Sequence, residues 1–380
     1  MIDKNQPLEI VNETSEGYLT QLQHELLETK ADLLEKERIV QLQNTLIRQQ
    51  LDALEKKQKV KEEMLVFYYL FRPFLLPLMW LVRPIYHGLK PRLGILNQYP
   101  PRELKVPAKY NKQAAFDVAP KISIVTPSFN QSEFIERTIK SVLEQSYPNL
   151  EFFVQDGGSD DGTKEILDRY SDRLTGWESC PDNGQSQAIN LGFARTSGEI
   201  MAWLNSDDIL LPGALAYVAD YFSRHPEVDV VYGHRILIDE NDQQIGRWMM
   251  PAHDNEILSW ADFIPQETMF WRRSIWKKAG GRIDESFRFA MDWDLLVRFR
   301  DAGACFVRLP RFIGGFRIHP QQKTSAVVSE IGFQEMSLLR QRLLGHVPIK
   351  SEIQKAVLPY LLRHVAIDLG WRIRNKLGLK

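Results

Sequence analysis

Short apolar runs alternate with helical patterns from about residue 120 onward, and this alternation restricts the fold more than any other feature of the sequence. Ile122 to Thr126 is a β-rich run, Ser132 to Gln145 has apolar residues at helical spacing, and Glu151 to Gln155 is strand-like again. This order predicts an α/β fold with a mostly parallel sheet and helices on both faces. In such folds, ligands bind in the crevice at the carboxyl ends of the strands.

The composition excludes several classes of protein. Of 380 residues, 44% are hydrophobic and 26% charged, which is typical of a globular protein. Lys and Arg number 48 against 49 Asp and Glu, so a net charge of −1 gives no case for nucleic acid as a partner. Cys180 and Cys305 are too few for a disulfide scaffold and fit a reducing cytosol. The N-terminal residues have no apolar signal core, so we expect a cytoplasmic protein.

The N-terminal part differs from the rest of the chain. We expect residues 1–17 to be a flexible N-terminus and residues 18–63 to form one long helix, because no Pro or Gly interrupts them. Apolar residues recur there every seven positions, at Leu19, Leu26, Leu33, Val40, Ile47 and Leu54. The second seam position is mostly polar, which predicts a weak coiled coil and a homo-oligomer through this helix. The alternative is a helix packed on the following domain of the same chain.

Residues 64–119 begin with a hydrophobic segment and continue as a Pro-rich linker. Arg72, Arg83 and three prolines divide the segment into apolar runs that are shorter than the roughly 20 residues of a membrane-spanning helix. Its aromatic residues and flanking arginines are typical of a segment that lies at a membrane surface. The alternative is a hydrophobic segment that folds against the rest of the protein.

Residues 326–380 are predicted to be helical. Leu361, Val365, Leu369, Ile373 and Leu377 repeat every fourth residue, and arginines and lysines lie among them. A basic amphipathic helix can bind anionic lipid, and the alternative is a helix docked on the domain. Together with the hydrophobic segment, this region favours a protein that is peripheral on the inner face of the cell membrane.

The first polar cluster follows the first two strands of the predicted sheet. Thr126, Pro127 and Phe129 leave the first strand, and Asp156 leaves the second, followed by Gly157. Backbone amides beside glycine can approach a ligand closely, and a carboxylate there can accept N–H groups of a base. An ordinary Asp-Gly turn is the alternative.

The second cluster ends the apolar run from Ile200 to Leu204. Asp207 and Asp208 are adjacent there, and two neighbouring carboxylates are costly unless a cation or hydrogen bonds compensate them. Carboxylates favour Mg²⁺ or Mn²⁺, which bind through one or two of them plus substrate phosphates. We therefore predict a metal site, and a helix N-cap at Asp208 is the alternative.

The third cluster opens a predicted helix. Asp292 and Asp294 stand on either side of Trp293. A partly buried carboxylate beside an aromatic ring has a raised pKa, which suits a general base near neutral pH. Helix capping explains one of the two acids equally well.

These three blocks, in this order, resemble glycosyltransferase family 2, the inverting enzymes with a GT-A fold and a mostly parallel Rossmann-like sheet. The resemblance spans the predicted domain of residues 120–325 and is strongest to bacterial members with the strings DNGQ, WLNSDD, IPQ and MDWDL. It implies a hexosyltransferase-type enzyme that uses a nucleotide-sugar, most simply a UDP-sugar, and Mn²⁺ or Mg²⁺. The acceptor would be a cell-surface polysaccharide or a lipid-linked glycan.

The resemblance also assigns roles to individual residues. The nucleoside would be held by Thr126, Pro127, Phe129, Asp156 and Gly157, with Asp156 facing the base. The diphosphate side would be lined by Asp182, Asn183, Gly184, Gln185 and Asn190. Asp207 would contact ribose or sugar, and the metal would be held by Asp207 and Asp208, with His319 as a further candidate. An ordinary surface histidine is the alternative for His319. Asp292 would be the catalytic base, and the acceptor side would hold Gln266, Glu267, Trp293 and Asp294.

The sequence departs from the family pattern at three places. Asn205 stands where many members have the first acid of the metal motif, Met291 replaces an acid before the base, and Ile189 replaces an arginine. None of these departures removes a residue that the mechanism requires. The alternative function is a catalytically silent GT-A-like protein that acts as a nucleotide-sugar sensor or scaffold. The retained acids favour an enzyme, because a protein that only binds the donor has no use for a base.

Overall fold

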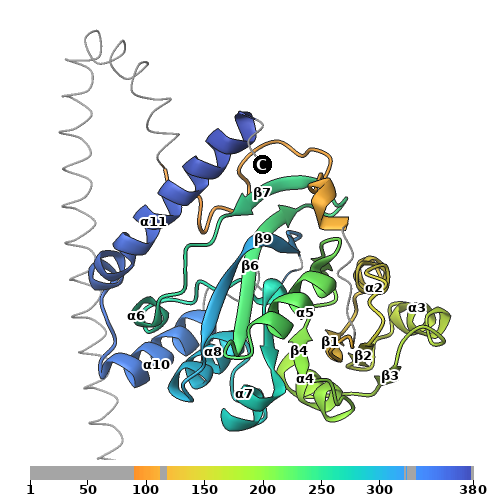
Figure 1. Cartoon of the computed structure of the whole chain (residues 1–380). Helices are drawn as coiled ribbons and strands as arrows, with labels where there is room; N and C mark the ends of the chain where they lie inside the picture. The colour runs from red at the N-terminus through yellow and green to blue at the C-terminus, as the bar shows by residue number, and fades with distance from the viewer. Residues whose placement is uncertain (1–89, 112–117, 321, 323–330, 378–380) are drawn as a thin grey trace, which may run out of the picture. The chain divides into compact units, whose positions relative to one another are not determined.

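The computed structural model describes residues 90–111, 118–320, 322 and 331–377, which belong to a compact unit spanning Gly88–Lys380 (Figure 1). Residues 1–88, which include the predicted flexible N-terminus, the predicted long helix of residues 18–63 and the hydrophobic segment of residues 64–88, lie outside the described residues. The coiled coil and the domain boundaries at residues 120 and 325 therefore stay predictions.

Strands and helices alternate along the first half of the described chain. The strands are β1 (Ile122–Ser128), β2 (Leu150–Asp156), β3 (Gly176–Ser179), β4 (Ile200–Trp203), β5 (Ile209–Leu210), β6 (Val230–Ile238), β7 (Gln244–Trp248), β8 (Phe270–Arg272) and β9 (Phe306–Arg317). The α-helices are α2 (Ile135–Leu143), α3 (Thr163–Arg169), α4 (Gln185–Ala194), α5 (Ala214–Arg224), α6 (Asn255–Leu258), α7 (Arg273–Lys278), α8 (Met291–Asp301), α10 (Phe333–Leu344) and α11 (Lys350–Lys376). Two 3₁₀ turns, Ala108–Asn111 and Gln266–Thr268, complete the described elements.

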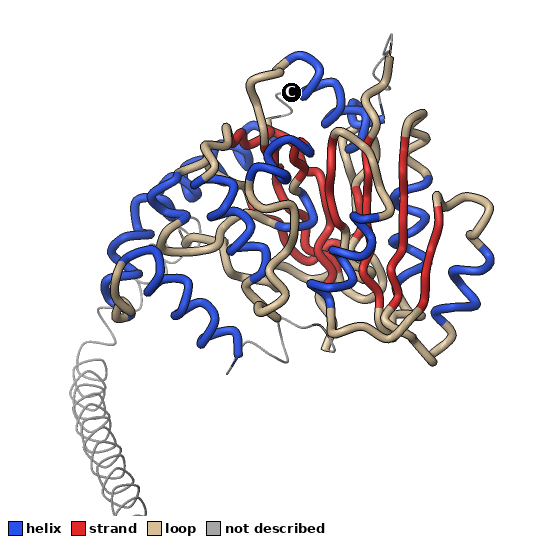
Figure 2. The backbone as a smooth tube through the Cα atoms, turned by 90° about the horizontal axis from the view of Figure 1, so that it is seen from below, coloured by secondary structure: helices blue, strands red, loops and turns tan. Residues whose placement is uncertain are grey.

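The described strands form one mixed sheet in the order β3-β2-β1-β4-β8-β6-β9-β5, with β7 paired to β6 (Figure 2). β3, β2, β1 and β4 run parallel, so their carboxyl ends share one edge. β8 pairs antiparallel with β4 and β6, while β6 and β9 are parallel to each other. The α/β class is confirmed. The part of the sheet beyond β4 is more antiparallel than the sequence predicts, because periodicity reports burial and not strand direction.

The sheet buries an apolar layer on each face. Ile124 on β1 and Ala202 on β4 pack with α2, α3 and α5. Val125 and Trp203, their neighbours in sequence, pack on the opposite face with α4 and α8. Side chains alternate between faces at every residue of a strand, so a fully apolar strand requires helices on both sides. The predicted strands and helices around residues 122–156 are thus confirmed.

The linker and the C-terminal helix pack against the same part of the domain. Arg102 bridges to Gln244 on β7, and the Arg92 backbone N–H donates to His364 Nε2 of α11 at 3.2 Å. The buried Asp368 of α11 pairs with Arg247 at 3.2 Å and with Arg372 at 2.9 Å. The predicted helical C-terminal region is confirmed as α10 and α11. No helix among the described residues is long and apolar enough to cross a bilayer.

Candidate active site at the carboxyl ends of the strands

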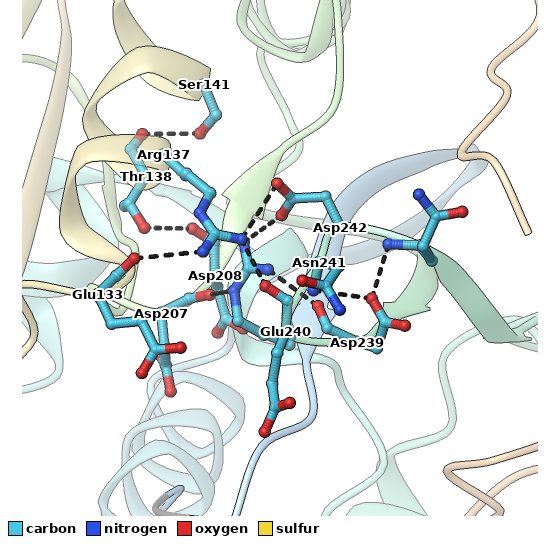
Figure 3. Close-up of polar contacts among 12 residues, drawn as sticks. Glu133, Arg137, Thr138, Ser141, Asp207, Asp208, Asp239, Glu240, Asn241 and Asp242 are labelled. Atoms are coloured by element: carbon cyan, nitrogen blue, oxygen red, sulfur yellow. Dashed lines mark hydrogen bonds and ion pairs between the residues drawn. The ribbon is translucent and has the colours of Figure 1, made fainter. Parts of the chain in front are cut away.

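The loop after β4 is held in one conformation by its neighbours. Thr138 Oγ1 on α2 lies 2.8 Å from the Ser206 carbonyl oxygen and 2.7 Å from that of Asp208 (Figure 3). Gln185 Nε2 at the start of α4 donates to Asn205 Oδ1 at 2.7 Å. The loop of residues 205–208, which we call the aspartate loop, is therefore fixed from both faces of the sheet.

Asp207 and His319 face each other at this loop. His319 Nε2 lies 3.1 Å from Asp207 Oδ2. The Phe134 ring packs on the imidazole at a centroid distance of 4.6 Å, and the Asp207 side chain is 21% exposed. An ordinary surface histidine, the alternative for His319, is wrong because only 4% of this residue is exposed.

The Asp207–His319 pair fits one divalent cation. Two ligands at adjacent positions of an octahedral ion, each about 2.1 Å from it, lie about 3 Å apart, close to the separation of these atoms. Within the described part of the chain, no three His, Cys, Asp or Glu side chains cluster in a way that could hold a metal. Two protein ligands leave the other positions to water and substrate phosphate, which is common for Mg²⁺ and Mn²⁺.

Asp208 turns inward beneath the aspartate loop. The residue is 1% exposed, and its Oδ1 accepts the Arg317 backbone N–H at 2.9 Å. Burial raises the pKa of Asp208 well above its usual value, and the charges of Asp207 and Glu267 raise it further. Its carboxylate therefore supports the loop from inside, whereas that of Asp207 opens toward solvent.

Asp156 lies at the end of β2 with its carboxylate surrounded by its own loops. Oδ2 accepts the N–H groups of Gly158 and Ser159 and the Ser179 hydroxyl, at 2.6 to 3.1 Å. Oδ1 accepts the Ser159 hydroxyl at 2.5 Å. The side chain is completely buried, so it organises the loop after β2 and does not point outward to a base.

Phe129, Gly157 and Asp182 form a cradle beside this loop. The Phe129 ring is 60% exposed at the end of β1. A Cβ at Gly157 would lie 3.2 Å from an Asp182 carboxylate oxygen and 3.3 Å from the Phe129 ring, so only glycine leaves this space open. Asp182 Oδ1 accepts the Gly184 N–H at 2.8 Å, while Oδ2 has no hydrogen-bond donor among the described residues. Desolvation raises the pKa of Asp182 despite that hydrogen bond.

Other predicted donor-side residues lie around the cradle. Thr126 and Pro127 are buried within β1, and the hydroxyls of Thr126 and Ser128 have no partner among the described residues. Asn183 and Gly184 are exposed at the N-terminus of α4, where the helix dipole favours an anion. Asn190 is not part of that surface, because its amide bonds to Ile283 and Glu285.

Asp292 lies at the start of α8 and is linked to the aspartate loop through α4. Ser186 Oγ, next to the Gln185 that contacts Asn205, lies 3.0 Å from Met291 Sδ. Asp292 Oδ1 accepts its neighbour Trp293 N–H at 2.9 Å. The helix start thus brings a carboxylate to the same end of the sheet as Asp207.

A second acid, Asp262 on the loop after α6, interacts electrostatically with Asp292. Asp262 is accessible to solvent, yet enough protein surrounds it that desolvation raises its pKa, and the charge of Asp292 adds to the effect. Sequence reasoning missed Asp262, which stands four residues before Gln266. The family pattern suggested that Met291 leaves Asp292 with less negative charge nearby, but the fold supplies an acid from another segment.

The four residues predicted on the acceptor side are all buried. Glu267 makes a two-armed ion pair with Arg235 at 2.7 and 2.5 Å, and Gln266 donates to the Trp203 carbonyl at 2.8 Å. Trp293 Nε1 donates to the Leu258 carbonyl. Asp294 pairs with Arg298 at 2.7 Å and with Arg342 at 2.6 Å. We assign these four side chains to the packing that supports the site.

Comparisons with known proteins show which family the chain is similar to. The model of the family described as "Glycosyl transferase family 2" matches residues 123–282. An uncharacterised glycosyltransferase of Mycobacterium tuberculosis is 31% identical over 186 residues, which cover 47% of this chain and 69% of that protein. Chondroitin synthase of Escherichia coli is 30% identical over 207 residues, covering 52% of this chain and 30% of the synthase.

Among solved structures, that of S. aureus TarS 1-349 in complex with UDP-GlcNAc covers 65% of this chain and 73% of its own, with a TM-score of 0.49 at 19% identity. The matched segment and the mycobacterial relative agree on one family. The chain belongs to glycosyl transferase family 2 and is a glycosyltransferase.

Proposed function

We propose that this enzyme moves a sugar from a nucleotide-diphosphate donor to a hydroxyl acceptor by a metal-assisted, inverting displacement. The observation that supports this most is the meeting of three features at one end of the sheet: the Phe129–Asp182 cradle, the Asp207–His319 pair and Asp292. They offer a base site, a cation site and a proton acceptor. These are the parts that the chemistry of sugar transfer needs.

The cradle is proposed to hold the nucleobase. Phe129 offers an exposed ring face on which a planar base can stack. The free oxygen of Asp182 can only accept a hydrogen bond while the carboxylate is ionised, so it selects bases with a ring N–H. Uracil, thymine and guanine have this group, whereas adenine and cytosine do not. We therefore give Asp182 the role that the family pattern gave to Asp156.

Asp207 and His319 are proposed to hold the cation that the donor diphosphate completes. A bound divalent ion would stabilise the negative charge that develops on the leaving nucleotide. Mg²⁺ is a hard ion that prefers oxygen ligands, and imidazole nitrogen is better accepted by transition metals, so the mixed pair favours Mn²⁺. The N-terminus of α4, whose helix dipole favours an anion, would face the same diphosphate.

Asp292 is proposed to take the proton from the acceptor hydroxyl as that oxygen attacks the anomeric carbon. The new C–O bond forms on the face opposite to the departing nucleoside diphosphate, which leaves with the bonding electron pair. One displacement of this kind inverts the anomeric centre. The silent-scaffold alternative gives no use for a second acid, Asp262, whose pKa is raised by burial and further by the charge of Asp292.

Replacing Asp182 by Asn tests the donor assignment. The amide keeps the size of the side chain but can present N–H where the carboxylate presents oxygen, so affinity for bases with a ring N–H should fall about 10-fold or more, the effect of one charge-assisted hydrogen bond. Binding of UDP, GDP, dTDP, ADP and CDP with Mn²⁺ would be measured by thermal shift, followed by donor hydrolysis and transfer. Asp156→Asn serves as the control, since it should lower stability without changing base preference. A wild type that hydrolyses and transfers no nucleotide-sugar would favour the silent scaffold.

We further propose that the C-terminal helix rests on an anionic membrane surface. Most of the exposed large hydrophobic side chains among the described residues lie beyond residue 330. On α11, Leu358, Leu362, Ile373 and Leu377 form an exposed stripe on the side away from the buried Asp368. The cations Lys355, Arg374 and Lys376 have no acidic partner within the described residues. An apolar stripe with free cations complements anionic lipid.

The chain also enters the domain beside this helix, at Arg92. The predicted membrane-surface segment of residues 64–88 precedes this point in the sequence and contains Arg72 and Arg83 but no acidic residue, so its composition also suits an anionic surface.

Flotation of the full chain with vesicles tests this surface. Wild type should float with phosphatidylglycerol-containing vesicles and not with pure phosphatidylcholine. The double change Leu362→Gln and Ile373→Gln should reduce the bound fraction about 10-fold or more, because each side chain loses about 1.5–3 kcal/mol of burial. Leu191→Gln, at an exposed leucine on α4, is the matched control. Flotation of the double variant equal to that of wild type would contradict lipid binding by the stripe. A change of the double variant from dimer to monomer would also contradict it, because the stripe would then contact a second copy of the chain.

A further inference from the structure

Arg317 links the aspartate loop to a hairpin turn that lies more than thirty residues away in the sequence. This last residue of β9 is completely buried. Its Nε donates to the Asp207 carbonyl at 2.8 Å, and its Nη1 donates to the Asp239 carbonyl at 2.9 Å. Its Nη2 forms an ion pair with Asp242 Oδ1 at 2.6 Å. With its backbone N–H on Asp208, one arginine holds both halves of the Asp207–Asp208 pair.

The turn between β6 and β7 presents acceptor groups to the Arg317 guanidinium. Asp239 and Asp242 close the turn between β6 and β7, close to the aspartate loop (Figure 3). Asp242 has a φ of 62°, a left-handed conformation that is uncommon for a residue with a side chain. Its second oxygen, Oδ2, lies 3.3 Å from Arg137 Nη1 of α2. The turn thus presents one carboxylate to two arginines.

The same packing reaches the second cation ligand. His319 stands two residues after Arg317, and the Phe134 ring lies under the Arg317 guanidinium at 5.0 Å as well as against the His319 ring. Fixing Arg317 therefore fixes the Asp207 main chain and the end of β9 that carries His319. If only the Asp207 main chain or only the end of β9 were fixed, the 3.1 Å distance between the Asp207 and His319 side chains would not be determined.

We propose that Arg317, held by Asp242, is a positioning residue that sets the Asp207–His319 geometry for the cation. This inference rests on the proposed metal site and adds to it a residue that touches neither the metal nor the substrate. Partners that orient metal ligands in this way typically change metal affinity 10- to 100-fold when they are removed. Lysine cannot replace the arginine, because one ammonium group cannot reach three acceptors that a planar guanidinium spans.

The chain offers a matched control on the same strand. Arg311 of β9 is also buried, and its Nη2 donates to two backbone carbonyls, of Tyr110 at 3.0 Å and of Pro212 at 2.7 Å. It touches no residue of the aspartate loop among the described contacts. Arg311→Lys and Arg317→Lys should therefore both lower the melting temperature, but only the second should change the response to metal.

Mn²⁺ titration of the full chain tests the proposal. Calorimetry would be run with whichever of UDP, GDP and dTDP binds best, alongside turnover as a function of Mn²⁺. Arg317→Lys should raise the Kd for Mn²⁺ about 10- to 100-fold, and its turnover should recover toward wild type at saturating metal. Asp242→Asn, which keeps the turn but loses the ion pair, should raise the Kd for Mn²⁺ about 10-fold. If Arg317→Lys does not fold, the Kd of Asp242→Asn alone tests the positioning role of Arg317.

Three results would overturn the inference. Mn²⁺ affinity in Arg317→Lys and Asp242→Asn that equals that of wild type would overturn it alone and leave the metal site standing. An equal loss of Mn²⁺ affinity in Arg311→Lys would show a general effect of stability and would also overturn it. Absence of any Mn²⁺ binding in wild type would instead overturn the proposed metal site, and this inference with it.

Discussion

Asp292→Asn should lower turnover about 10²- to 10⁴-fold, which is the usual contribution of a general base. The amide cannot accept the proton of the acceptor hydroxyl, while its oxygen can still accept the Trp293 N–H that Asp292 receives at 2.9 Å. Donor binding should therefore change less than twofold, since the base acts on the acceptor. Steady-state transfer kinetics and calorimetry with the nucleoside diphosphate measure the two effects separately.

Asp294 provides the matched control on the same helical turn. Its carboxylate is buried and pairs with Arg298 and Arg342, so Asp294→Asn should lower the melting temperature and leave the turnover of the folded enzyme nearly unchanged. Wild-type turnover in Asp292→Asn would exclude it as the base. An equal loss of turnover in Asp294→Asn would return that residue to the acceptor side, where the family pattern places it.

Asp207→Asn should abolish metal-stimulated transfer, with a loss of about 10³-fold or more, equivalent to about 4 kcal/mol of transition-state stabilisation. A neutral amide is a poor ligand for a hard cation, and His319 alone would remain to bind it. Thermal shift with Mn²⁺ and nucleoside diphosphate should show the loss without any need for turnover, because a ligand that binds only the native state raises its stability.

Asp208→Asn is the informative comparison for Asp207. The Asp208 carboxylate is buried, and its raised pKa means that burial already favours its neutral form. The amide oxygen can accept the Arg317 N–H in its place, so we expect a loss of turnover below about 10-fold, the effect of one rearranged hydrogen bond. If Asp208→Asn abolishes Mn²⁺ binding while Asp207→Asn retains it, the cation belongs to Asp208 and the assignment to Asp207 and His319 fails.

Local patterns in the sequence predicted the elements on which the site is built. The run from Ile122 to Thr126 became part of β1, whose residues are all buried because helices cover both faces of the sheet there. The polar clusters followed from the same reading, since a buried strand that ends in Asn-Ser-Asp-Asp must release those groups at its carboxyl end. Both inferences need only residues that are near one another in the chain.

Which side chain of each cluster faces outward depended on contacts between distant segments. Asp156 and Asp182 are both acids after strands, but Ser159 and Ser179 surround the first and leave the second open to the Phe129 cradle. Asp207 and Asp208 are adjacent, yet Arg317, more than a hundred residues later, turns one of them inward. Loops that meet only in the folded chain decide these choices.

The sequence by itself determined the strand–helix order, the ends of the strands and hence the edge of the sheet where acids gather, because periodicity and turn residues act over a few positions. Tertiary structure alone decided that His319 lies within hydrogen-bond distance of Asp207 and that Asp262 and Asp292 interact electrostatically. It also decided that Glu267 forms an ion pair with Arg235. Burial and pairing arise when segments far apart in the chain are packed together, and no short stretch of sequence contains that information.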